Sequence, residues 1–331
     1  MPAPFERMQG SLPDVARSSG MRTVLRIAGF VLAVLSFAFL GFRLLSELEQ
    51  LPPLAWTGIA TGAMLAAIGL VVAIEAVHSL AWRTLARAID PRVTWRESFA
   101  LCGRSQIAKY LPGNVFHYVQ RVVLAREDGI GAVEASGLAV VDAVLLAVTG
   151  VVVGLPALRH GLQLAAPFAF LTSPIAGFVV VTAVLVGGGL LLARPEVRAR
   201  IRQLARVVAP RRLVGAVLLD TVPFVMAGVT VHLVLHGFWP GVAQLGWLDF
   251  IPGFALAFVV GFATPGAPGG VGVREMVLYL LYAPALGGGL AAALFLLLRV
   301  AYILGDTATF VAASWIQSAQ PGRTGARADT P

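Results

Sequence analysis

The sequence predicts an all-α polytopic membrane protein, and three features of the chain lead to this fold class. Of the 331 residues, 58% are hydrophobic and only 13% are charged, whereas soluble domains average about 25% charged residues. Apolar runs of about 20 residues, the length needed to cross a bilayer, recur along the chain. Arginines gather between these runs. We therefore expect about six to eight spanning or membrane-dipping helices.

The predicted spans follow from the apolar runs. These runs are Ile27–Leu45, Leu54–Ile74, Ala135–Leu158, Leu162–Ala193, Leu213–His236, Phe250–Val273, Met276–Leu298 and Val300–Ile316. Proline and glycine interrupt the chain between 250 and 298, and proline breaks a helix because it lacks a backbone donor. That part of the chain is therefore predicted to be broken rather than a pair of plain spans.

The distribution of arginine predicts the orientation. Segments 81–97 and 194–212 are rich in arginine, whereas 46–53, 156–172 and 237–248 carry almost no basic residues. Basic loops remain on the cytoplasmic side of a membrane. We expect a cell inner-membrane protein with both termini in the cytoplasm.

Three regions are predicted along the chain. Residues 1–24 form a cytoplasmic tail, 25–316 form the membrane domain, and 317–331 form a polar C-terminal tail. The single cysteine, Cys102, excludes a disulfide framework and a cysteine metal cluster. The net charge of +8 is accounted for by cytoplasmic loops, so no nucleic-acid partner is expected, and no motif for a metal or cofactor is present.

The charge map requires two segments that do not cross the membrane in the ordinary way. Residues 98–134 must enter and return on the cytoplasmic side or lie along it. After 237–248 the simplest arrangement is a re-entrant hairpin over about 249–288, which dips from the outside, followed by one long span over about 289–316. Three ordinary spans would also bring the C-terminus to the cytoplasmic side, because they too are an odd number of crossings.

The two broken segments resemble each other. Leu-Pro-Gly at 111–113 precedes Arg121, and Thr-Pro-Gly at 264–266 precedes Arg274 at the same spacing. Because the match is short, chance similarity and a true internal repeat both remain open. A true repeat, with halves of about 54–193 and 213–316, would have inverted topology, and paired broken helices then build the substrate site near the midplane.

The chemistry of these segments favours an anionic ligand. Broken backbone at membrane depth survives only where protein or a water-filled cavity satisfies its polar groups. A freed helix N-terminus attracts phosphate, and an arginine binds phosphate oxygens with two parallel hydrogen bonds. The candidate substrate-binding residues are Lys109, Pro112, Gly113, Arg121, Pro265, Gly266, Gly269, Gly270, Arg274 and Glu275.

Four ionisable residues lie inside predicted spans: Asp142, Asp220, Arg299 and Asp306. Each costs on the order of 3 kcal/mol in a membrane unless it finds a partner, so a functional role and a structural ion pair both remain open. We expect Arg299 to pair with Asp142 or Asp220. Asp306 lies on the same helical face as Arg299, because the two are seven residues apart.

Two further pairs are expected between near neighbours in the sequence. Glu275 is expected to orient Arg274 toward a phosphate or to form a mutual ion pair with it, and a third alternative is that the two are charges at the membrane edge. Glu75 and His78, one turn apart after the second apolar run, are expected to form a local pair.

The same residues carry a resemblance to a known family. Lys-Tyr-Leu-Pro-Gly at 109–113 and Pro-Gly-Ala-Pro-Gly-Gly-Val-Gly-Val-Arg-Glu at 265–275 resemble the two signature stretches of the lysylphosphatidylglycerol synthase transmembrane-region family, also called flippase-like domain proteins. The resemblance covers roughly 25–316. It implies a polytopic domain that moves lipids or lipid-linked molecules between leaflets.

The chain departs from this family in two respects. The best-known members carry a soluble aminoacyl-transferase, and only 317–331 follow the last predicted span, so we expect a stand-alone member without lysyl transfer. The third span of the family is expected to hold an acidic residue beside an arginine, whereas Val141-Asp142-Ala143 offers only the acid.

Three hypotheses of function follow. The first is a translocator of membrane lipids that are anionic or linked to polyprenyl phosphate. The second is an integral-membrane transferase that acts on a lipid-linked substrate with Glu275 as base, and the third is a membrane partner subunit of a glycosyltransferase. Because no catalytic motif is present, we favour the non-enzymatic translocator.

Overall fold

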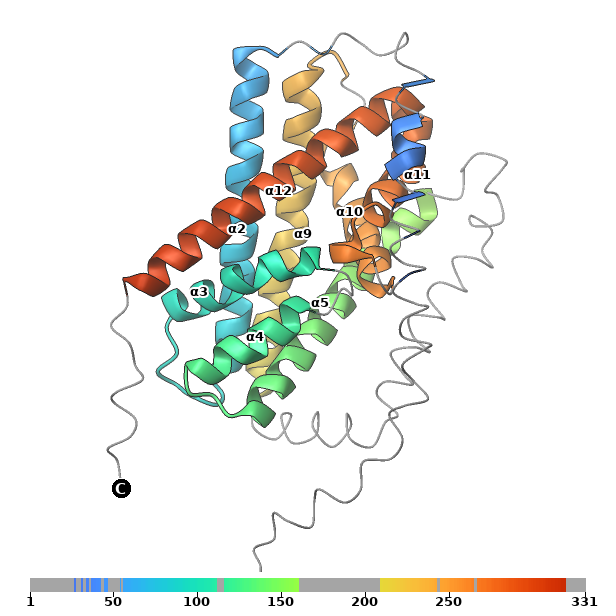
Figure 1. Cartoon of the computed structure of the whole chain (residues 1–331). Coiled ribbons are helices and arrows are strands. Elements are labelled where there is room, and N and C mark those ends of the chain that lie inside the picture. Colours follow the sequence, from blue (N-terminus) through green and yellow to red (C-terminus); the bar gives the residue numbers. More distant parts are fainter. Residues whose placement is uncertain are drawn as a thin grey trace, which may run out of the picture.

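The computed structural model describes residues 54, 56–111, 116–160, 209–242, 245–264 and 267–319, together with scattered positions between 27 and 46 (Figure 1). In these ranges all regular structure is helical. The elements are α2 (Gly58–Ala86), α3 (Trp95–Gln106), η4 (Ile107–Tyr110), α4 (Phe116–Glu127), α5 (Ala132–His160), α9 (Pro210–Phe238), α10 (Trp247–Ala263), η7 (Pro268–Gly270), α11 (Val273–Leu286) and α12 (Gly288–Ser318).

Four of the described helices, α2, α5, α9 and α12, are long and apolar enough to cross a membrane. This confirms the prediction of a polytopic all-α membrane protein. The predicted span Leu162–Ala193 lies outside the described residues, and Ile27–Leu45 lies mostly outside them. Helices α2 and α9 run antiparallel along each other, because Gly237 near the end of α9 packs on Ala63 near the start of α2.

Helix α2 is longer than the apolar run Leu54–Ile74 predicts. It begins after Thr57, whose side-chain oxygen accepts a hydrogen bond from the Ala60 N–H at 3.1 Å, as N-cap residues do. It continues to Ala86, so Glu75 and His78 lie within the helix rather than after it. Charged and polar side chains are tolerated there because neighbouring helices supply partners for them.

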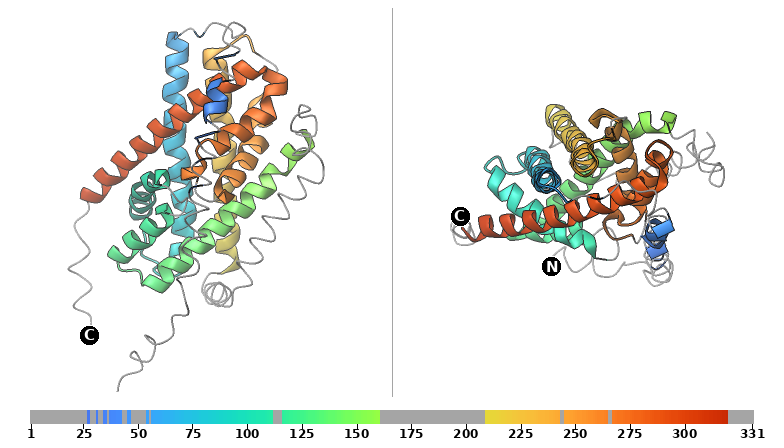
Figure 2. Two further views of the ribbon diagram at one scale, coloured as in Figure 1. Left: turned by 45° about the vertical axis from the view of Figure 1, so that its right-hand side comes forward. Right: turned by 90° about the horizontal axis from the view of Figure 1, so that it is seen from above.

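Helix α12 crosses the molecule diagonally (Figures 1 and 2). Its 31 residues give a length of roughly 46 Å, which exceeds the roughly 30 Å hydrocarbon core and fits a tilted helix. The predicted long span over 289–316 is therefore confirmed. Gly287, with a φ of +84°, lies between α11 and α12 and permits the sharp turn there, because glycine alone tolerates that backbone region at little cost.

Glycine also lets the helices approach closely where they cross. A Cβ atom at Gly154 of α5 would lie 2.9 Å from the Leu256 backbone nitrogen of α10. A Cβ atom at Gly305 of α12 would lie 2.5 Å from the Val71 Cβ of α2. Small residues at helix crossings are typical of membrane bundles, where close packing replaces the hydrophobic effect as the driving force.

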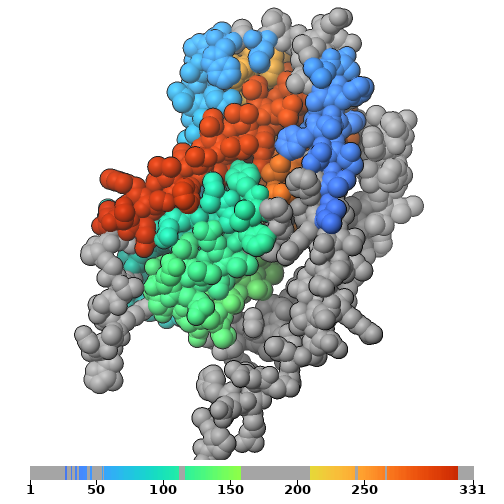
Figure 3. Space-filling view, in the orientation of Figure 1, coloured from blue at the N-terminus to red at the C-terminus, as the bar shows by residue number. Residues whose placement is uncertain are grey.

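The two broken segments enter the bundle from opposite ends. Helix α3 packs beside the C-terminal half of α2 and α4 packs on α3 and α5, whereas α10 starts next to the C-terminal end of α9 and α11 returns to the same end, where α12 begins (Figures 1 and 2). At 12 residues each, α3 and α4 are roughly 18 Å long, too short to span. Figure 3 shows α3 and α4 beneath α12 on one face of the molecule.

The tips of the broken segments meet. A Cβ atom at Gly269 of η7 would lie 3.2 Å from the Lys109 Cγ atom of η4. The apolar packing is divided around this point into two clusters, one built on α2, α9, α10, α11 and α12 and the other on α2, α3, α4, α5 and α9. Two short, broken helical segments are therefore present where they were predicted, and their re-entry into the membrane stays a prediction.

The predicted orientation can be tested by cysteine labelling. Cys102 is fully buried, so a Cys102→Ala background removes the natural thiol. In that background Arg92→Cys, on the exposed turn between α2 and α3, should react with a membrane-impermeant maleimide only in inverted vesicles. Gly241→Cys, on the exposed turn after α9, should react only in intact cells. Labelling of both positions from the same side would contradict the orientation.

Candidate functional site

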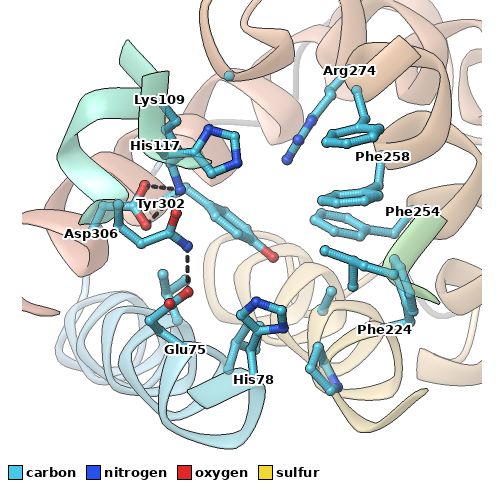
Figure 4. A pocket seen from close by; sticks show the side chains of 18 of the residues that line it. Glu75, His78, Lys109, His117, Phe224, Phe254, Phe258, Arg274, Tyr302 and Asp306 are labelled. Atoms are coloured by element: carbon cyan, nitrogen blue, oxygen red, sulfur yellow. Dashed lines mark hydrogen bonds and ion pairs between the residues drawn. The ribbon is translucent and has the colours of Figure 1, made fainter. Parts of the chain in front are cut away.

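A cavity of about 110 Å³ lies where the two broken segments meet (Figure 4). By volume it can hold several water molecules or a small polar headgroup. One wall is aromatic, formed by Phe224, Phe254, Phe258 and Phe262. The other lining groups are mainly polar, and they include Glu75, His78, Gln106, Lys109, His117, Arg121, Arg274, Tyr302 and Asp306.

Arg274 points into the cavity from the start of α11 (Figure 4). Its guanidinium lies over the ring of Phe258 at 4.4 Å, a favourable cation–π arrangement. Among the described residues it forms no ion pair, and its buried Nε atom has no hydrogen-bond partner. The Arg274 side chain is half-buried, and a partly desolvated cation without an opposite charge at hydrogen-bond distance is costly. The sequence predicted this residue as a ligand-binding group, and the structure places it in the lining of the cavity.

Glu275, next in the sequence, does not orient Arg274. Its Oε2 atom accepts a hydrogen bond from the Gly272 N–H at 2.6 Å, which caps the start of α11, and its Oε1 atom lies 3.2 Å from the Arg299 Nη1 atom. The expected contact between Glu275 and Arg274 is therefore wrong. The reason is geometric, since adjacent residues on a helix point in different directions.

Arg299 pairs with Glu275, so the expected pairing of Arg299 with Asp142 or Asp220 is also wrong. The guanidinium of Arg299 lies 5.3 Å from the ring centroid of Tyr110. The hydroxyl of the same tyrosine donates to Asp306 at 2.5 Å. Arg299 and Asp306 thus contact one residue of η4, as expected for two residues on one face of α12.

Lys109 is tied to α12. Its Nζ atom lies 2.8 Å from the carboxylate of Asp306, and together with the Tyr110 hydroxyl it fastens the tip of the first broken segment. The described range ends at Leu111, so the predicted site residues Pro112 and Gly113 lie outside it. Pro265 and Gly266 of the second segment also lie outside them.

A buried network below the cavity joins four helices. Arg121 of α4 donates to Asp142 of α5 at 2.8 Å, and both side chains are almost completely buried. His78 of α2 forms a 3.1 Å hydrogen bond to Asp220 of α9 and lies 3.2 Å from Arg121. The arginine that pairs with Asp142 thus comes from α4 and not from the same span as the acid. Trp82 and Tyr118 flank its guanidinium at 5.2 and 5.4 Å.

Several cavity residues were not among the sequence candidates, namely Glu75, His78, Gln106 and Tyr302. Glu75 accepts a hydrogen bond from the Gln106 side-chain amide, and its other buried oxygen has no partner within the described ranges. Glu75 and His78 have separate partners, so the expected local pair is wrong. Their spacing of one helical turn beyond a charge-free run was the available signal, and it was misinterpreted as the end of the span.

Gly269 and Gly270 form the tight turn of η7 at the edge of the cavity. Their φ angles are +57° and +70°, a region that strains other residues. A Cβ atom at Gly270 would also lie 2.7 Å from the Arg274 Nε atom and 2.9 Å from the Gly261 Cα atom. This turn therefore fixes the position of Arg274.

Replacement of Gly270 by alanine should lower the free energy of unfolding by about 1–3 kcal/mol, because strained backbone and a close contact coincide there. The measurement is thermal unfolding of the purified protein in detergent. The matched control is Gly62→Ala, because Gly62 lies in the exposed part of α2 with open space around it, where alanine is the better helix former. Equal melting temperatures for Gly270→Ala and the wild type would contradict this prediction.

Residues 23–308 match the family described as Lysylphosphatidylglycerol synthase TM region. The chain belongs to this family. No curated protein matches it.

The matched region of this lysylphosphatidylglycerol synthase TM region protein includes both broken segments and all four intramembrane charges. The resemblance inferred from 109–113 and 265–275 is therefore confirmed. Membership and the four apolar helices together identify an integral membrane protein whose function is related to membrane lipids.

Proposed function

We propose that this protein moves a phospholipid or lipid-linked precursor between leaflets and binds the headgroup phosphate at Arg274. The observation that carries the proposal is the position of Arg274, a cation that lies in the cavity without an ion pair in the described part of the chain. A guanidinium in a site shielded from water binds phosphate strongly, because its planar fork matches two phosphate oxygens.

Neighbouring groups support a phosphate in this position. The Tyr302 hydroxyl and the His117 Nδ1 atom line the same cavity, are buried, and have no hydrogen-bond partner among the described residues. A phosphate oxygen would accept a hydrogen bond from the hydroxyl, and from the imidazole when Nδ1 carries a proton. The free oxygen of Glu75 would accept a hydrogen bond from a hydroxyl or ammonium group elsewhere on the headgroup.

The arrangement of helices supports movement of the ligand rather than chemistry on it. The cavity lies between segments that enter from opposite ends, so small rotations of either segment would open it toward one leaflet or the other. The aromatic wall would accompany the apolar part of a lipid while Arg274 holds its headgroup. We place the protein in the cell inner membrane with both termini cytoplasmic, on the arginine distribution.

The transferase alternative has weaker support. Glu275 would have to leave both Gly272 and Arg299 before it acted as a base. No contact among the described residues favours a partner subunit of a glycosyltransferase. That function is one of the outcomes of the test described next.

Purified protein in liposomes containing fluorescent phosphatidylglycerol tests the proposal. We expect leaflet exchange, detected by quenching of the outer leaflet, to be faster than in protein-free liposomes while the lipid stays chemically unchanged. A new lipid product would support the transferase. Neither exchange nor product, together with an enzyme that co-purifies with the protein, would support the partner subunit.

A further inference from the structure

The network beneath the cavity contains a histidine held between two carboxylates. The Nδ1 atom of His78 is hydrogen-bonded to Asp220 at 3.1 Å. Its Nε2 atom has two competing neighbours, the Arg121 Nη1 atom at 3.2 Å and the Asp142 Oδ2 atom at 3.5 Å. All four groups are almost completely buried, and each comes from a different helix.

The protonation state of Nε2 decides which neighbour it prefers. Arginine is a donor only, so a 3.2 Å contact to Arg121 fits a neutral imidazole whose Nε2 accepts and whose Nδ1–H donates to Asp220. When Nε2 carries a proton it can no longer accept from Arg121, and it can donate to Asp142 instead. Asp142 has capacity for this, because its Oδ2 atom, which faces Nε2 at 3.5 Å, loses Arg121 as a donor in the exchange, and its buried Oδ1 atom has no partner within the described ranges.

The charges of the four groups favour such a proton. With a neutral His78, one arginine and two carboxylates leave a net charge of −1 in a buried site, and one added proton makes the network neutral. Buried networks with an uncompensated charge are costly. The proton comes from the aqueous phase, and only the N–H bond of His78 is formed or broken.

The network communicates with the headgroup site because His78 and Arg121 both line the cavity. We propose that His78 is a proton-binding site linked to headgroup binding: a proton on Nε2 replaces Arg121 as the partner of Asp142 and frees Arg121 for the phosphate. This inference rests on the proposed function, and it identifies the proton as the ion whose binding is coupled to that of the headgroup. Linkage requires the reverse effect as well, so a bound phosphate draws a proton onto the network.

Other ionisable groups surround His78 and contribute to the electrostatic environment of its proton. They are Glu75 on its own helix α2, Cys102 on α3, Arg121 and His117 on α4, Asp142 on α5, Asp220 on α9, and the Lys109–Asp306 pair between η4 and α12. Among these only His78 contacts two carboxylates and an arginine at once. It is therefore the group at which a proton changes the partners of Arg121.

Calorimetric titration of the full-length protein in detergent tests the link. The probe is dihexanoyl phosphatidylglycerol, titrated in two buffers of different ionisation enthalpy at several pH values between about 5 and 9, which bracket the usual range of histidine. We expect the wild type to take up close to one proton for each headgroup bound, at the pH of maximal uptake. His78→Gln should bind with uptake near zero, and Asp220→Asn should shift the pH of maximal uptake downward.

The control is His232→Gln on α9, a histidine that does not line the cavity; it should match the wild type. Binding by the wild type without proton uptake, or equal uptake by His78→Gln and the wild type, would overturn this inference and leave the proposed function standing. No binding by the wild type at any pH would overturn both. Asp220→Asn provides the decision if His78→Gln does not fold, since wild-type behaviour in that variant contradicts the link.

Discussion

Replacement of Arg274 by methionine should slow leaflet exchange of phosphatidylglycerol roughly tenfold to hundredfold, because hydrogen bonds to charged groups contribute about 1.5–3 kcal/mol. The same change should leave the melting temperature equal to that of the wild type or raise it. Arg274 is half-buried and has no ion pair in the described part of the chain, so methionine removes a partly desolvated charge and keeps apolar contacts with Phe258. Exchange in proteoliposomes and thermal unfolding in detergent provide the two measurements.

Slower exchange without a lower melting temperature would show that Arg274 binds the ligand and does not mainly stabilise the fold. A structural arginine would lose both together when replaced. Arg274→Lys should retain part of the activity, since lysine keeps the charge but loses the two-pronged geometry. Arg92→Ala is the matched control, because the Arg92 side chain is 71% exposed and pairs only at the surface with Asp90. Equal exchange rates for Arg274→Met and the wild type would remove the site assignment.

The sequence was sufficient for those features that depend on local patterns. Apolar length predicted the helices α5 and α9 to within a few residues, and the arginine distribution together with the glycine-rich break predicted α12 to a similar accuracy. The proline and glycine residues near 112 and 265, combined with the arginine distribution, predicted two short broken segments from opposite ends. Gly269 and Gly270 were among the candidate binding residues, and both adopt positive φ in the turn beside Arg274.

The sequence was insufficient for those features that depend on how helices pack. The partners Arg121 and Asp142, and His78 and Asp220, are separated by 21 and 142 positions, and no spacing rule connects them. The cavity combines side chains from both broken segments and from α2, α9 and α12. A single apolar window also places the end of α2 too early, because it treats Glu75 as water-exposed when Gln106 supplies a partner inside the bundle.

Replacement of Asp142 alone by leucine should lower the free energy of unfolding by about 3–5 kcal/mol, because it leaves the buried guanidinium of Arg121 without its carboxylate. Arg121 is only 2% exposed, so it cannot reach bulk water without moving α4. Thermal or denaturant unfolding in detergent measures the change.

The double variant Arg121→Met/Asp142→Leu separates two contributions to the free energy of unfolding. One is the stabilisation by the ion pair, and the other is the cost of leaving Arg121 buried without Asp142. Removal of both charges should recover most of the loss, since hydrophobic residues of similar volume often replace a buried ion pair at little cost. Recovery would mean that the pair is retained for a reason other than stability, as expected if Arg121 has to exchange Asp142 for a phosphate. Additive losses in the double variant would instead indicate that each side chain stabilises the bundle through contacts of its own, such as those of Arg121 with Trp82 and Tyr118, and that the network is a fixed part of the scaffold.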